Sequence, residues 1–87
     1  MNETRLADLF KQRDNAFAFG REMGQRAAEQ YLARPQIETI ANAPAAQLAA
    51  VVKKATTHHA EQPYGATQIA GFVESVRAVY ARLIAIG

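Results

Sequence analysis

The sequence predicts an all-α domain, arranged as a small helical bundle or an open helical hairpin. No segment alternates apolar and polar residues as a half-buried strand would. Nineteen of the 87 residues are alanine, the strongest helix former, and the three prolines fall between apolar segments rather than within them. Because 87 residues are too few for two domains of ordinary size, we expect a single helical domain over residues 1–87.

The first helix is predicted over residues 3–33. Proline 35 disfavours a helical conformation at Arg34 and so ends this segment. Asp14-Asn15 is a possible interruption, since either residue can cap a new helix, and we expect one long helix that is kinked there at most. The apolar residues that recur at close to the helical period are Leu6, Leu9, Phe10, Ala16, Phe17, Met23, Ala27 and Tyr31.

Two shorter helices are predicted next, over residues 35–41 and 44–57. Each has a proline in its first turn, where the missing N–H is not needed, and Ile37 and Ile40 mark the apolar side of the first. Residues 56–68 contain Pro63 and Gly65 and form the one long connection.

The last helix is predicted over residues 67–86, where apolar residues write a continuous stripe at helical spacing. Four of them, Phe72, Val76, Val79 and Leu83, are expected to be largely buried. Ser75 falls between the apolar positions, and we place it with Glu74 and Arg77 on the polar faces.

A row of small residues stands out in the first helix. Ala16, Gly20, Gly24 and Ala28 follow one another at intervals of four, which allows another backbone to approach closely. Two interior glycines cost a helix about 1 kcal/mol each relative to alanine, so close packing is expected to offset that cost.

The partner of this row is either another helix of the same chain or a second copy. A first helix of about 46 Å overhangs a last helix of about 30 Å, and this favours a second copy, with a dimer as the simplest assembly. The residues predicted for self-association are Phe17, Gly20, Met23, Gly24 and Tyr31.

The connection carries the other candidate site. Lys53, Lys54, His58, His59 and Tyr64 could together bind a phosphate or a nucleotide, or contact an acidic partner. The simpler interpretation, which we favour, is an exposed helix end with lysines beside the negative end of the helix dipole.

The composition argues against most catalytic chemistry. Without cysteine there are no disulfides, thiolate ligands or cysteine nucleophiles. Two adjacent histidines point about 100° apart on a helix and cannot chelate one metal ion, and the single serine has no histidine at helical spacing. We therefore expect no enzyme activity, no metal and no cofactor.

The charge pattern does not favour nucleic-acid binding. Ten basic and eight acidic residues give a net charge of only +2, so nucleic-acid binding is possible but not favoured. The longest uncharged stretch, residues 39–52, is too short to cross a membrane, and the N-terminal residues do not resemble a signal peptide, so we expect a cytoplasmic protein.

We therefore expect a small self-associating protein-binding module: an adaptor, an inhibitor or an accessory factor, a class that includes inhibitors encoded by mobile elements. The alternative is a nucleotide- or nucleic-acid-binding module that uses Lys53, Lys54 and the 56–67 loop.

Overall fold

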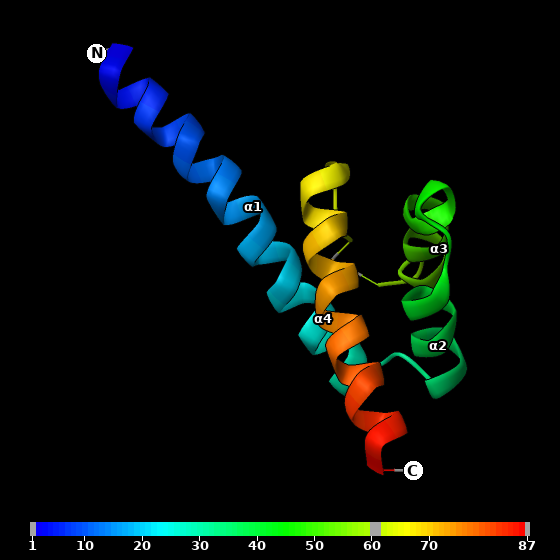
Figure 1. Ribbon diagram of the computed structural model, residues 1–87. Coiled ribbons are helices and arrows are strands. Elements are labelled where there is room, and N and C mark those ends of the chain that lie inside the picture. The colour runs from blue at the N-terminus through cyan, green and yellow to red at the C-terminus, as the bar shows by residue number, and fades with distance from the viewer. Residues whose placement is uncertain (1, 60–61, 87) are drawn as a thin grey trace.

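The computed structural model confirms the all-α class. It describes the backbone of residues 2–59 and 62–86, and the side chains of residues 15–59 and 62–86. The helices are α1 (Asn2–Gln30), α2 (Arg34–Asn42), α3 (Leu48–Ala55) and α4 (Gly65–Ile86), with a single 3₁₀ turn, η1 (Ala45–Gln47), before α3. Helix α4 lies between α1 on one side and the α2–α3 pair on the other (Figure 1).

Helix α1 is continuous through Asp14-Asn15, as predicted, but ends at Gln30 rather than at residue 33. The Leu32 N–H donates to the Ala27 carbonyl at 2.8 Å, which closes the last turn, and Ala33 is extended. The Ala33 N–H then donates to Oε1 of Gln36 at 2.8 Å. This local hydrogen bond, with Pro35 in the first turn, starts α2 one residue earlier than predicted.

The predicted middle helix, 44–57, is shorter in the structure. Its first turn is the 3₁₀ turn η1, and α3 ends at Ala55. The Thr56 hydroxyl donates to the Val52 carbonyl and the Thr57 hydroxyl to that of Lys53, at 2.9 and 2.8 Å. The Thr57 hydroxyl satisfies a carbonyl that a longer helix would pair with the Thr57 N–H, which instead donates to Lys54, whereas the Val52 carbonyl also accepts the Thr56 N–H.

The core is formed where all four helices meet. Its largest fully buried apolar side chains are Ile40, Val52, Phe72, Val73 and Val76. Val79 and Leu83 are only partly buried, and the last turn of α4 emerges from the bundle, with Ile86 87% exposed. The predicted stripe is therefore correct for Phe72 and Val76 but fades beyond them, because α1 has ended there.

Helices α1 and α4 run parallel to each other. Gly20 lies against Gln68, and Gly24, one turn later, lies against Phe72, one turn later in α4, so the two helices run in the same direction (Figure 1). Two parallel neighbours need a long connection, and α2, α3 and the segment before α4 supply it. The molecule measures 53 × 24 × 24 Å and is elongated, because the N-terminal part of α1 projects past the first turn of α4.

We expect Val76→Ala to lower the free energy of unfolding by about 1–3 kcal/mol, because two buried methyl groups leave a cavity that the surrounding helices cannot fill. Val76 is fully buried, whereas Ile84 on the same helix is 54% exposed. Ile84→Ala is the control and should cost clearly less in the same urea unfolding experiment. Equal losses in the two variants would contradict the core described above.

Candidate functional site

The small-residue row of α1 packs against α4 of the same chain. A Cβ atom built on Gly24 would lie 2.9 Å from Cα of Phe72, and one on Gly20 would lie 2.9 Å from Cα of Gln68. Both neighbours are backbone atoms, which cannot rotate away as a flexible side chain can. The preferred prediction, that this row joins two copies, is therefore corrected in favour of the internal alternative.

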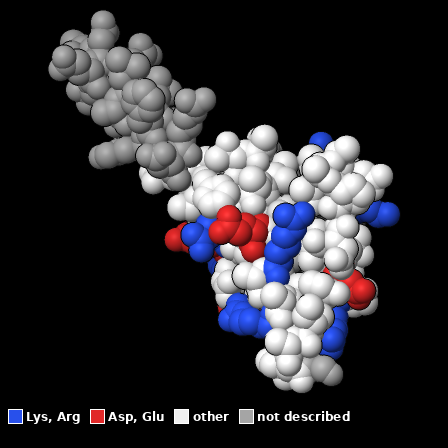
Figure 2. Space-filling model, in the orientation of Figure 1, with Lys and Arg blue, Asp and Glu red and all other residues white. Residues whose placement is uncertain are grey.

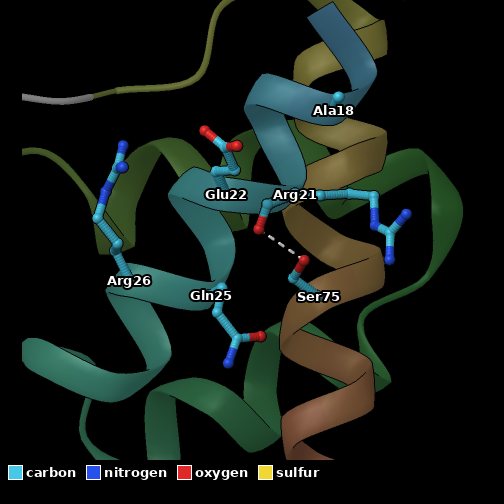
Figure 3. A pocket seen from close by; sticks show the side chains of 6 residues that line it. All are labelled: Ala18, Arg21, Glu22, Gln25, Arg26 and Ser75. Atoms are coloured by element: carbon cyan, nitrogen blue, oxygen red, sulfur yellow. Dashed lines mark hydrogen bonds between the residues drawn. The ribbon is translucent and has the colours of Figure 1, made fainter. Parts of the chain in front are cut away.

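Helix α4 carries the matching small residues. A Cβ on Gly71 would lie 2.9 Å from the backbone nitrogen of Arg21, and it would also meet the Phe17 carbonyl. Ser75, four residues on, is 7% exposed, and its hydroxyl donates to the Arg21 carbonyl at 2.6 Å (Figure 3). Placing Ser75 on a polar face was wrong, because the close approach of α1 covers it.

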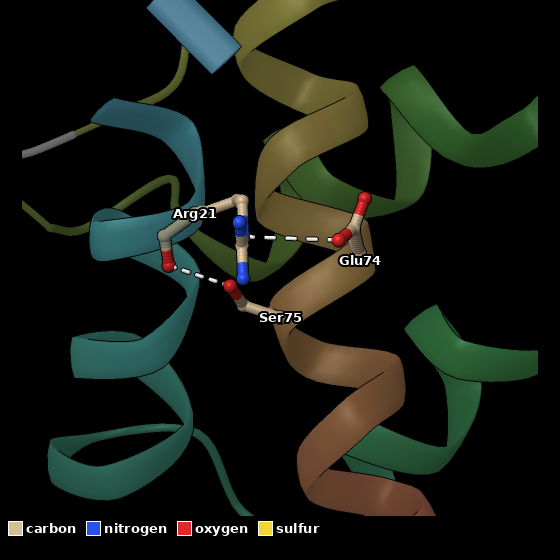
Figure 4. Close-up of polar contacts among 3 residues, drawn as sticks. All are labelled: Arg21, Glu74 and Ser75. Atoms are coloured by element: carbon tan, nitrogen blue, oxygen red, sulfur yellow. Dashed lines mark hydrogen bonds and ion pairs between the residues drawn. The ribbon is translucent and has the colours of Figure 1, made fainter. Parts of the chain in front are cut away.

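We call this contact the α1–α4 seam, formed by Gly20 and Gly24 on α1 and Gly71 and Ser75 on α4. An ion pair between Nε of Arg21 and a Glu74 oxygen, 3.7 Å apart, crosses its outer side (Figure 4). Both side chains are more than half exposed, so this ion pair adds little stability. The seam depends instead on backbone proximity and the buried Ser75 hydrogen bond.

The other residues predicted for self-association also have partners within the chain. Met23 is 4% exposed and belongs to the core. The Tyr31 ring stacks on His59, with ring centroids 3.8 Å apart and planes 15° from parallel. Phe17 is partly buried beside the seam. Gly20, Met23 and Gly24 are therefore buried within the chain, which corrects their assignment to a surface between copies. Phe17 and Tyr31 are only partly buried, and their part in self-association stays a prediction.

The candidate ligand loop does not form one site. Lys53 lines a cleft between α3 and the start of α4, together with Tyr64. Lys54 lines a different cleft, between α2 and α3. His58 is exposed, whereas His59 is partly buried under Tyr31. The helical twist separates the adjacent lysines, because neighbouring side chains on a helix point about 100° apart.

Several polar side chains of this connection hold the fold together. The Gln62 amide donates to the carbonyls of Thr56 and Thr57, at 2.7 and 3.1 Å, and so caps the end of α3. The Tyr64 N–H donates to Oε1 of Gln68 at 2.7 Å, which caps the start of α4. Gly65, at φ 71°, provides the left-handed turn between them.

A further open hollow lies on the outer side of the seam. Arg21, Glu22, Gln25 and Arg26 surround it, with Ser75 at its base (Figure 3). Both signs of charge surround this hollow, and the surface seen in Figure 2 likewise intersperses basic and acidic side chains. No field of one sign covers the part of this face that the structure describes, so it gives no support to a nucleic-acid footprint.

Comparison of the chain with protein-family models, with curated proteins and with solved structures finds no match. Among the described residues, no group of three or more His, Asp or Glu side chains is arranged to hold a metal ion. None of the helices, over the residues that the structure describes, is long and apolar enough to cross a membrane. Function is therefore argued from the geometry of this chain.

The signal for Gly71 and Ser75 was present in the sequence. The two small residues are four apart, the spacing that marks Gly20 and Gly24 on α1. Matching the two pairs would have identified α4 as the partner of the row. The divergence of Lys53 from Lys54 follows from helix geometry and was foreseeable, but the clefts that the two lysines line depend on where α2 and α4 pack around α3.

Gly24→Ala tests the seam directly. Alanine favours a helix by about 1 kcal/mol over glycine, so the change would stabilise an uncovered α1. Against the Phe72 backbone we expect the opposite sign, a loss of about 1–3 kcal/mol of unfolding free energy. Ala70→Gly, on the exposed side of α4, calibrates helix propensity and should cost about 1 kcal/mol. A stabilised Gly24→Ala variant would refute the seam.

Added zinc should leave the melting temperature unchanged. Binding to the folded state alone would raise it, by an amount that grows with the logarithm of the zinc concentration, but His58 is exposed and His59 stacks on Tyr31. Differential scanning fluorimetry with and without zinc measures this. A saturable increase that His58→Ala abolishes would show that the connection is a metal site after all.

Proposed function

We propose that this chain is a small recognition module that binds another protein and associates with itself, using the projecting part of α1. The observation that carries the proposal is the stagger of the parallel pair. Gly20 lies against Gln68, so the start of α4 at Gly65 is level with Phe17. Helix α1 before Phe17 extends beyond the bundle (Figure 1). Its residues 2–16 span about 22 Å at about 1.5 Å per residue.

A projecting helix of this length is stabilised when a partner packs against its apolar face. Isolated helices shorter than about 12–15 residues are marginal in water, because most helical stability in proteins comes from packing an apolar face. The sequence of the segment carries Leu6, Leu9 and Phe10, whose side chains lie outside the described residues. At its base, Phe19 is 46% exposed. A second copy or a partner helix would bury such apolar groups.

The proposed role is that of an adaptor, an inhibitor or an accessory factor, including the class encoded by mobile elements, and it involves recognition rather than catalysis. A dimer remains the simplest form of self-association, although the small-residue row no longer supports it. A cytoplasmic location also stays a prediction.

The nucleic-acid alternative receives no support from the geometry. It required Lys53, Lys54 and the 56–67 loop to act as one basic surface, but the two lysines line different clefts. One lysine at each cleft supplies too little charge to neutralise a run of phosphates.

The test is sedimentation velocity over a range of concentrations. Wild-type protein should associate, and a variant that lacks residues 1–13 should stay monomeric, because it loses the projecting segment. That variant should keep the thermal transition of the bundle, since every described seam contact lies at Phe17 or later. Phe19→Ser should weaken association by about 1–2 kcal/mol.

Tyr64→Ser is the matched control, because Tyr64 is 75% exposed but lies at the start of α4, away from the projecting segment. It should leave association unchanged. A wild-type protein that is monomeric at every concentration would refute self-association. A shortened variant that associates as strongly as wild type would show that α1 is not the binding element.

A further inference from the structure

The cleft between α3 and the start of α4 has the form of a small binding site. Its volume is about 300 Å³, at the lower end of the range for ligand pockets. Ala49 and Ala50 of α3 form one wall, Pro63 and Ile69 form the other, and the fully buried Thr56 lies at its base. Apart from the base, these walls are apolar and have short side chains, which leave the space open.

The polar groups of the cleft divide into two kinds. Thr56 and Gln62 donate their side-chain hydrogens to backbone carbonyls and hold the connection in place. Lys53 and Tyr64 do not: neither side chain has a polar partner among the residues that the structure describes. Of the polar residues that line the cleft, Lys53 and Tyr64 are therefore the two whose side-chain polar groups are not engaged in the fold, and both residues are exposed, Tyr64 to 75%.

Among the described residues that line this cleft, Lys53 is the one cation. Lys54 faces the α2–α3 cleft, and the His59 ring is stacked on Tyr31. The one positive charge of Lys53 suits a ligand that carries one negative charge. A phosphate monoester carries nearly two charges and three strong acceptor oxygens, and it would press polar atoms against the alanine and isoleucine walls, where burial without hydrogen bonds is costly.

We propose that this cleft binds a small monocarboxylate with a compact apolar body. The Lys53 ammonium pairs with the carboxylate, the Tyr64 hydroxyl donates a second hydrogen bond, and the apolar body fills the space between Ala50 and Ile69. A charge-assisted hydrogen bond of this kind is about twice as strong as a neutral one, so Lys53 supplies both affinity and selectivity for the anion. The site is separate from the projecting part of α1, and it does not rest on the function proposed above.

The experiment is an NMR titration of the full ¹⁵N-labelled chain with benzoate, and with benzamide as its neutral analogue. Benzoate should cause saturable shifts of the backbone amides of Lys53, Thr56 and Ile69. Benzamide, which has the same apolar body but no charge, should bind about tenfold more weakly. Lys53→Gln should weaken benzoate binding by about tenfold, whereas the matched control Lys54→Gln should leave it unchanged.

A second variant tests the space rather than the charge. Ala50→Leu keeps Lys53 but narrows the cleft, and it should also reduce benzoate binding, with a native thermal transition because position 50 is exposed. Three results would overturn the proposal: no saturable shifts with benzoate, equal losses in the two lysine variants, or inorganic phosphate binding as tightly as benzoate at equal ionic strength.

Discussion

The contact on which the rest of the structure depends is the backbone approach of α1 and α4 along the seam. Gly20 and Gly24 face backbone atoms of α4, and Gly71 faces backbone atoms of α1, so neither helix could move closer. The cost of glycine within a helix is repaid by dispersion contacts between two backbones and by the Ser75 hydrogen bond to the Arg21 carbonyl. No larger residue at these positions would permit that approach.

Because the paired helices are parallel, the seam also determines the path of the chain between them. The chain must return along the part of α4 that α1 covers before that helix begins. Helices α2 and α3 make this return and cover the face of α4 opposite α1, where Ile40 and Val52 complete the core with Phe72. The caps made by Gln36, Gln62 and Gln68 fix the ends of these helices through local hydrogen bonds.

The stagger of the seam decides which surfaces remain available. It leaves the first half of α1 beyond the bundle at one end and the last turn of α4 exposed at the other (Figure 1). It also places the start of α4 beside α3, which creates the cleft at Lys53. The residues singled out for binding from the sequence mostly serve the fold: Met23 lies in the core, and Tyr31 is engaged by His59. The surfaces proposed for binding are those left over once the seam has formed.

The sequence by itself determined the helices, their approximate ends and the buried positions of Phe72 and Val76, because periodicity, prolines and capping residues act within a few residues of one another. It also predicted that Gly20 and Gly24 pack closely against another backbone. Only the tertiary structure decided which backbone that is, since a small-residue row fits a second copy as well as α4. The same holds for Ser75, which became buried, and for the two different clefts that Lys53 and Lys54 line. Each of these outcomes depends on the packing of helices far apart in the chain, and local sequence does not encode the position of a distant neighbour.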